Sequence, residues 1–208
     1  MNRMFDDNRI EDGDRSYVVE EGAGFVLLSA PHQVEHGREG TIKQAEPDTG
    51  RLARCLNERI GCPIIYRCGS SLEDPNYDEA SAYRDRIVRF VEEKGIKVVL
   101  DLHEMAARHQ SMVEIGTGHG RNIDDRDDLL AVVRRAFESH GIEPVTVDTV
   151  FPAAGFFRVS SDVARRSPAC CFQIEMNVRM FGFDACPSAF EAVCGSLEEA
   201  VIRLGEVI

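Results

Sequence analysis

The sequence predicts one α/β domain of three layers, with a mixed, mainly parallel sheet flanked by helices. Short apolar or β-branched runs alternate with longer segments in which apolar residues recur at helical spacing. Of the 208 residues, 43% are hydrophobic, enough for a sizeable core. No repeat, linker or low-complexity tract divides the chain, so residues 1–208 are assigned to one domain, with 1–15 as a charged leader that is flexible or lies at an edge.

The first half of the chain begins with an expected edge strand near 17–19 and an apolar core strand at 25–30. A long polar loop follows. Asp48, a favoured N-cap residue, then starts a helix that runs to Ile60 and is closed by Gly61. The apolar run after this glycine, IIYR, is the next strand.

The following helix carries Tyr83, Ile87, Phe90 and Val91 at helical spacing, and Gly95 is its C-cap. The continuous apolar run that comes next predicts a buried strand. From there the pattern predicts a strand at 97–102, a strand at 112–116 with a glycine-rich turn, a helix over 125–140, a strand near 145–147, a long loop over 151–162, a strand at 170–176 and a final helix over 188–206.

Composition excludes several classes of function. The net charge of −12, with no long basic run, argues against a nucleic-acid or anionic-membrane partner. No apolar run approaches the roughly 20 residues that cross a bilayer, and the N-terminus lacks the apolar region of a signal peptide. Seven cysteines without C-x-x-C spacing predict reduced thiols and a cytoplasmic protein. A small anionic substrate and a homo-oligomer are compatible with this composition.

Two histidines stand at the ends of apolar runs, His32 after FVLLSAP and His103 after KVVLDL. If these strands are parallel neighbours, both side chains emerge at the carboxyl rim of the sheet, where α/β proteins bind ligands. Asp101, two residues before His103, could orient its ring. A carboxylate from the intervening segment would complete a three-ligand zinc site with one open position.

Two glutamates compete as the third ligand. Glu35 forms H-x-x-E with His32, which brings both side chains into one turn, and spacing alone slightly favours it. Glu46 opens EPDTG at the start of the expected helix and could reach the same rim. His36 is expected to be a loop residue.

Charged and polar residues elsewhere could serve catalysis and substrate binding. Glu175, at the end of the last strand, is the candidate general base, and a structural ion pair with Arg179 is the alternative. Asn177 and Arg179 are candidates for binding substrate. Arg38 could bind a substrate carboxylate, with a solvated loop position as its alternative, and Arg158 is a weaker candidate for this role.

Taken together, these motifs resemble the N-formylglutamate amidohydrolase-like proteins, which are related in fold to zinc carboxypeptidases and phage poly-γ-glutamate hydrolases. The resemblance spans about residues 25 to 180. It rests on APH at 30–32, REG at 38–40, EPDTGRLA at 46–53, DLH at 101–103 and QIEMN followed by Arg179. The family usually has a Ser-Gly pair after the first histidine, where this chain has Gln33 and Val34.

The resemblance implies one Zn²⁺ ion with His32, Glu46 and His103 as ligands and Glu175 as the base, and Glu35 stays as the alternative ligand. The predicted reaction is the hydrolysis of an amide bond next to a carboxylate by metal-activated water, on an N-acyl amino acid or a γ-glutamyl or peptide-like substrate. A rival hypothesis is a non-catalytic binding or regulatory domain. A third is a nucleotide-binding protein built on GTGHG, although this motif lacks the third glycine of a dinucleotide fingerprint.

Overall fold

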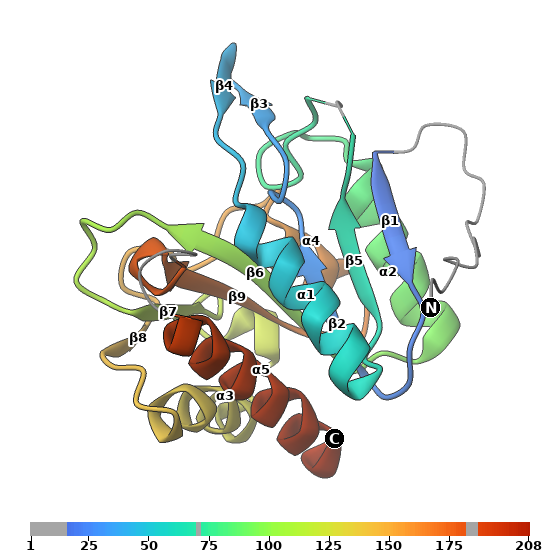
Figure 1. Ribbon diagram of the computed structural model, residues 1–208. Helices are drawn as coiled ribbons and strands as arrows, with labels where there is room; N and C mark the ends of the chain where they lie inside the picture. The colour runs from blue at the N-terminus through green and yellow to red at the C-terminus, as the bar shows by residue number, and fades with distance from the viewer. Residues whose placement is uncertain (1–15, 70–71, 182–186) are drawn as a thin grey trace, which may run out of the picture.

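The computed structural model describes residues 16–69, 72–181 and 187–208, so the predicted leader at 1–15 and Cys186 lie outside the described residues. A seven-stranded sheet forms the centre of the domain (Figure 1). Its strands, in spatial order, are β1 (Tyr17–Glu20), β5 (Ile64–Arg67), β2 (Val26–Ala30), β6 (Val98–Met105), β9 (Cys170–Asn177), β7 (Val113–Gly116) and β8 (Val145–Val147). Strands β5, β2, β6 and β9 are parallel, whereas β1 and β7 run antiparallel to their neighbours β5 and β9. The predicted mixed, mainly parallel sheet is confirmed.

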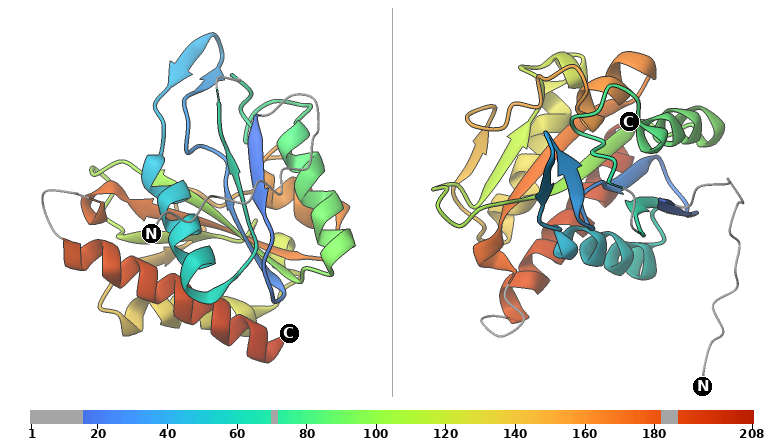
Figure 2. Two further views of the ribbon diagram at one scale, coloured as in Figure 1. Left: turned by 45° about the vertical axis from the view of Figure 1, so that its right-hand side comes forward. Right: turned by 90° about the horizontal axis from the view of Figure 1, so that it is seen from above.

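Helices cover both faces of this sheet (Figure 2). One face packs against α1 (Pro47–Ile60), α3 (Asp127–Ser139) and α5 (Pro187–Val207), and the other against α2 (Ala82–Lys94) and α4 (Val159–Arg166). Because both faces are covered, successive residues of a central strand join opposite cores. In β9, Cys170 packs against the core under α1, α3 and α5, and Cys171 belongs to the core under α2 and α4, because successive side chains of a strand point to opposite faces.

Helix α1 brings a carboxylate to the carboxyl rim, and its start differs from the prediction. The helix begins at Pro47, so Glu46 and not Asp48 is the N-cap residue. Proline suits the first helical position because it has no N–H to leave unpaired. The N–H of Asp48 instead donates to Oε1 of Glu104 at 2.8 Å, so a side chain from β6 caps the helix. Gly61 ends the helix with φ of 66°, a left-handed conformation that glycine adopts without strain.

Three further differences concern the surroundings of the rim. The polar loop after His32 contains a two-stranded hairpin, β3 (His36–Arg38) and β4 (Thr41–Lys43), which projects beyond the sheet (Figure 1). The predicted loop over 151–162 ends in the first turn of α4. Strand β6 continues to Met105, so His103 lies within the strand and not after it. In the described part of the chain, no helix is long and apolar enough to span a bilayer.

Candidate metal centre and its surroundings

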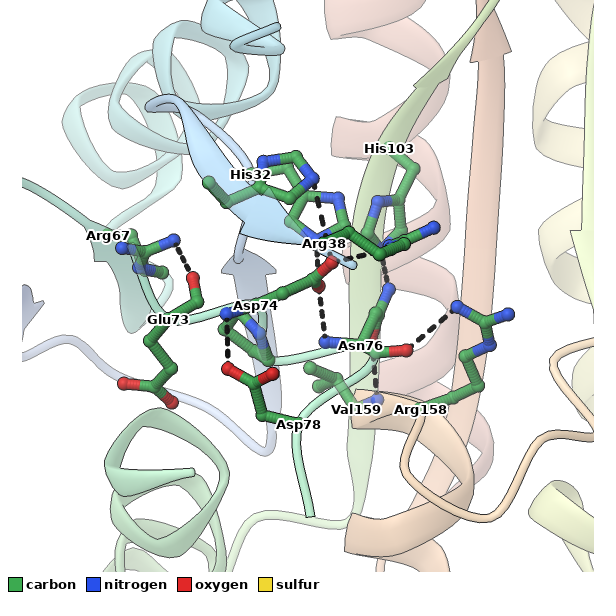
Figure 3. Close-up of polar contacts among 12 residues, drawn as sticks. His32, Arg38, Arg67, Glu73, Asp74, Asn76, Asp78, His103, Arg158 and Val159 are labelled. Atoms are coloured by element: carbon green, nitrogen blue, oxygen red, sulfur yellow. Dashed lines mark hydrogen bonds and ion pairs between the residues drawn. The ribbon is translucent and has the colours of Figure 1, made fainter. Parts of the chain in front are cut away.

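The candidate site lies at the carboxyl ends of the parallel strands β2, β6 and β9. Strands β2 and β6 are adjacent, with Ser29 opposite Asp101, as the sequence argument required. His32 follows β2 by two residues and His103 lies near the end of β6. Their rings meet edge to face, with centroids 4.8 Å apart. Both side chains are buried (Figure 3).

Glu46 lies between the two histidine rings. Its Oε1 is 3.2 Å from Nδ1 of His32, and its Oε2 is 3.1 Å from Nδ1 of His103. The ligand atoms of the three residues all lie within 4.8 Å of one another. Two imidazole nitrogens and a carboxylate oxygen are a donor set that zinc accepts in catalytic sites, with a fourth position left open. The residues therefore fit a zinc ion.

A buried carboxylate contacts the far ring nitrogen of each histidine. Nε2 of His103 lies 3.0 Å from Oδ2 of Asp101, and Nε2 of His32 lies 3.0 Å from Oδ1 of Asp74. Both aspartates are fully buried. A carboxylate at one ring nitrogen keeps the N–H there and leaves the lone pair of the other nitrogen available to a metal. In both rings that other nitrogen is the Nδ1 atom that faces Glu46.

The charges of His32, Glu46 and His103 shift one another's pKa values. Burial lowers the pKa of His103, but the carboxylates of Asp101 and Glu46 outweigh burial and raise this pKa well above its ordinary value. Burial raises the pKa of Glu46, and the charges of His32 and His103 overcome it and hold the pKa of Glu46 well below its usual range. Protons on the histidines thus balance Glu46, and a metal ion that bound here would displace them.

The backbone positions Glu46 for this contact. The N–H of Glu46 donates to the carbonyl oxygen of His32 at 2.8 Å, which ties the start of α1 to the end of β2. Oε2 of Glu46 also accepts from the N–H of Glu104 at 3.1 Å. Glu35, the alternative predicted from the H-x-x-E spacing, is exposed and lies outside both groups of potential ligands in the described residues.

A second group of potential ligands consists of His32, His36 and Asp74. The rings of His36 and His32 are stacked, with centroids 3.9 Å apart and planes 7° apart. The nitrogen lone pairs of imidazole lie in the ring plane, so two stacked parallel rings cannot both point at one ion. Arg38 also donates from Nε to Oδ2 of Asp74 at 2.6 Å. Burial lowers the pKa of His36 to about 4, which keeps this ring neutral against His32. The group supports His32 and is poorly suited to hold an ion of its own.

Glu175 lies opposite His103 in the parallel pair of β6 and β9. Its Oε1 accepts from Nε2 of Gln173 at 2.9 Å. Burial raises the pKa of Glu175 to about 7, against the opposing charges of His103 and His32. A carboxyl group with a pKa near neutrality can both take up and return a proton.

Two arginines from separate segments lie near the buried carboxylate of Asp74. Arg38 lies in the hairpin, and Arg158 precedes α4 and donates from Nη1 to the carbonyl oxygen of Asn76 at 2.8 Å (Figure 3). Burial and then the charge of Arg38 lower the pKa of Arg158, while Asp74 and Glu175 oppose this. Because the two guanidinium groups repel each other, an anion between them would be stabilised.

The other two predicted substrate residues have protein partners. Nδ2 of Asn177 donates to the carbonyl oxygens of His109 and Ser111 at 3.1 and 3.0 Å. Its Oδ1 accepts from the backbone N–H and Nε of Arg179, both at 3.1 Å, and Nη2 of Arg179 donates to His109. Both residues thus brace the segment 109–111, and their roles in substrate binding stay predictions.

Sequence reasoning missed Asp74 and Asn76. Nδ2 of Asn76 lies 3.0 Å from Nε2 of His103, the nitrogen that Asp101 also contacts, and we assign the N–H of that ring to Asp101 because a carboxylate is the stronger acceptor. Oδ1 of Asn76 accepts from the N–H of Val159 at 2.7 Å. The only available signal was the turn-forming sequence Asp-Pro-Asn in an irregular segment.

The glycine-rich turn GTGHG lies away from this site. Strand β7 is antiparallel to β9, so the turn leaves the sheet at the opposite end. The carboxylate of Asp148 accepts from the N–H of Thr117 at 2.7 Å and from the N–H of His119 at 3.2 Å. A carboxylate therefore occupies the backbone donors that a phosphate would need. This arrangement disfavours the nucleotide hypothesis.

The chain has the fold of several solved hydrolase structures. It is similar to a bacteriophage poly-γ-glutamate hydrolase, with a TM-score of 0.62 at 15% identity over 95% of this chain and 94% of the other. It is also similar to N-formylglutamate amidohydrolase from Ralstonia eutropha JMP134, with a TM-score of 0.56 at 14% identity over 94% and 98%. A third match is N-acetylmuramoyl-L-alanine amidase from Clostridium difficile 630, with a TM-score of 0.51 at 14% identity over 86% and 96%.

No protein-family model and no curated protein sequence matches the chain. At these identities the structural matches show a shared fold, that of hydrolases of amide bonds, and the expected fold relationship is confirmed.

Proposed function

We propose that this protein is a zinc-dependent amide hydrolase that cleaves an amide bond next to a carboxylate. One observation carries the proposal. The Nδ1 atoms of His32 and His103 both face the carboxylate of Glu46, and both Nε2 atoms face buried aspartates. This arrangement keeps three ligand atoms directed at one point. The shared fold with amide hydrolases adds support.

Zinc held by these three residues would supply a Lewis acid that polarises a carbonyl and lowers the pKa of water. The protein supplies the proton transfers. Glu175, whose pKa burial raises to about 7, can take a proton at a carboxylate oxygen near neutral pH. In its protonated form it can then donate that proton to the leaving amine.

The substrate preference follows from the two arginines. Arg38 binds Asp74 through Nε, so its two terminal NH₂ groups can bind a ligand. Its side chain is 27% exposed. Arg158 faces the same region from across Asn76. In this proposal Arg38 binds the substrate carboxylate and Arg158 adds to the positive field. Arg179 and Asn177 retain their predicted substrate roles as part of the proposal.

Metal content and hydrolysis test the proposal together. Purified protein should contain zinc near one ion per chain after dialysis against zinc, and His103→Ala should lose it. A matched control is His119→Ala, because His119 is an exposed histidine of the turn away from the site. Hydrolysis is screened with N-acyl amino acids and γ-glutamyl amides, each with a carboxamide analogue that lacks the free carboxylate.

The proposal fails if the wild-type chain binds no stoichiometric divalent metal. Zinc binding without hydrolysis of any carboxylate-bearing amide would favour the rival hypothesis of a non-catalytic binding domain. Equal rates on the acid and its carboxamide analogue would contradict the role given to the arginines. Each outcome thus bears on a separate part of the proposal.

A further inference from the structure

The hydroxyl group of Tyr83 joins two strands of the sheet below the candidate metal centre. Tyr83 lies in the first turn of α2 and is fully buried. Its hydroxyl oxygen accepts from the N–H of Ala30 in β2 at 3.0 Å and lies 3.0 Å from the carbonyl oxygen of Ile65 in β5, to which the hydroxyl can donate. Ala30 is two residues before His32. This single hydroxyl therefore fixes the end of the strand that leads to one histidine.

The same hydroxyl group also reaches the other histidine through two side chains. It lies 2.9 Å from Oγ of Ser29, and Ser29 donates from Oγ to Oδ1 of Asp101 at 2.7 Å, so the single hydroxyl proton of Tyr83 is shared between Oγ of Ser29 and the carbonyl oxygen of Ile65. Oδ2 of Asp101 contacts Nε2 of His103 at 3.0 Å. All of Ser29, Tyr83 and Asp101 have zero exposure. The chain of contacts is thus shielded from water along its length.

We propose that Tyr83 and Ser29 are positioning residues that set the orientation of the metal-binding histidines, an inference that rests on the proposed zinc site. Ser29 donates to one oxygen of Asp101, and the other oxygen then faces Nε2 of His103. With Nε2 fixed in this way, Nδ1 of His103 faces Glu46. Tyr83 holds Ser29 and the end of β2 at the same time. Neither residue touches a ligand atom of the proposed metal, so both act through others.

Packing alone does not account for this arrangement. The ring of Tyr83 packs in the core under α2 and α4, edge to face against Tyr17. Phenylalanine would fill nearly the same volume, whereas only the hydroxyl satisfies Ala30 and Ile65. Burying a hydroxyl group without hydrogen-bond partners costs free energy. Here the partners are the backbone of β2 and β5 and the side chain of Ser29, which leads to Asp101. Tyr83 at the base of α2 thus connects the helix layer to the metal centre.

Zinc affinity of Ser29→Ala and Tyr83→Phe tests the inference, measured by competition with a chromogenic chelator. Loss of the group bonded directly to a metal-ligating histidine weakens metal binding by about 10-fold or more, and because Ser29 and Tyr83 act through Asp101 we expect the lower end, about 3- to 10-fold for each variant. Tyr66→Phe and Ser196→Ala are the matched controls, because they remove the same groups where these donate to Glu20 and to the carbonyl oxygen of Ala192 and contact neither the histidines nor Asp101. We expect both controls to bind zinc like the wild type.

A second measurement is independent of the metal. In the zinc-free protein, the Nε2 proton of His103 should give a downfield, slowly exchanging resonance because Asp101 accepts it. Ser29→Ala and Tyr83→Phe should broaden or abolish this resonance, and the controls should keep it. A purely structural role would lower the melting temperature while it left both zinc affinity and this resonance unchanged.

The outcomes separate this inference from the proposed function. If the wild type binds zinc and both variants bind it equally well with an unchanged resonance, the positioning inference is overturned and the proposed function stands. If the wild type binds no zinc, the proposed function falls and the inference falls with it. If Tyr83→Phe does not fold, Ser29→Ala decides alone, because it leaves the bridge from Tyr83 to Ala30 and Ile65 in place.

Discussion

Glu175→Gln should stabilise the zinc-free protein above neutral pH and should not do so in acid. Glu175 is buried on β9, and burial raises its pKa to about 7 from an ordinary value of 4.5. Between these two values the folded protein binds a proton that the unfolded chain has lost. The free energy of unfolding therefore falls as pH rises through this window. Glutamine has nearly the same shape but no ionisable group, so the variant does not lose unfolding free energy in this pH range.

The magnitude follows from the size of the pKa change. A change from 4.5 to about 7 at roughly 1.4 kcal/mol per pKa unit corresponds to about 3 to 4 kcal/mol, reached fully only above pH 7. At pH 5 most of this cost is absent, because Glu175 is protonated in the fold. We therefore expect the gain in unfolding free energy from Glu175→Gln to be about 2 to 3 kcal/mol larger at pH 8 than at pH 5.

Urea unfolding in the presence of a chelator measures this difference at both pH values. Glu35→Gln is the control, because that carboxylate is exposed and its replacement should change the free energy of unfolding by the same small amount at both pH values. A gain of the same size at pH 5 and pH 8, or a loss at pH 8, would refute the linkage between burial and ionisation. In the zinc-loaded protein the same substitution should abolish hydrolysis, since Glu175 is the proposed base. Stability and activity would then change in opposite directions.

Three further perturbations test other parts of the structure. Arg84→Lys should lower the free energy of unfolding in urea by about 3 kcal/mol, because lysine cannot replace the buried guanidinium that binds Asp162 and four backbone carbonyls. A decrease of less than about 1 kcal/mol would contradict this. Glu114→Ala should lower the free energy of unfolding by about 3 kcal/mol and speed amide hydrogen exchange at 149–151, because Glu114 accepts hydrogen bonds from these three N–H groups. Unchanged exchange at these positions would contradict this. Arg38→Ala should raise KM at least about 10-fold for a carboxylate-bearing amide with kcat little changed, and a fall in kcat alone would assign it another role.

Much of the fold could be predicted from the sequence because its strands have simple patterns. The central strands are buried on both faces, and their continuous apolar runs identify them without a structure. The hairpin at 36–43 and helix α4 were missed because one is short and mostly exposed and the other has only eight residues. Neither carries enough periodic apolar residues to be recognised.

The histidines were predictable from the sequence and their partners were not. His32 and His103 each follow an apolar run, so strand ends alone brought them together. Asp74 and Asn76 belong to an irregular segment whose path depends on tertiary bonds to Arg84, and no local pattern encodes that path. The choice of Glu46 over Glu35 also came from the family resemblance, since spacing alone slightly favoured the other residue.

The strands nevertheless contain a signal that distinguishes the site from the core. On the face that packs against α2 and α4, residues change from apolar to polar towards the carboxyl ends. Leu27 is followed by Ser29 in β2, and the equivalent positions of β6 and β9 become polar at the same level. These positions are Asp101 and His103 in β6, and Gln173 and Glu175 in β9. On the opposite face the same strands stay apolar through Leu28, Leu102 and Met176, and the polar residue there, Glu104, caps α1.

Stability does not explain why this face of the sheet buries polar groups. Replacing a buried ionic group with an apolar side chain of similar size is often neutral or stabilising, so stability alone gives no reason to keep Glu175 opposite His103. A domain that only bound a partner through its surface would gain from an apolar strand end. The polar groups here also converge on one point from three strands and one helix terminus. That convergence is what metal-assisted chemistry requires, and it favours an enzyme over a non-catalytic domain.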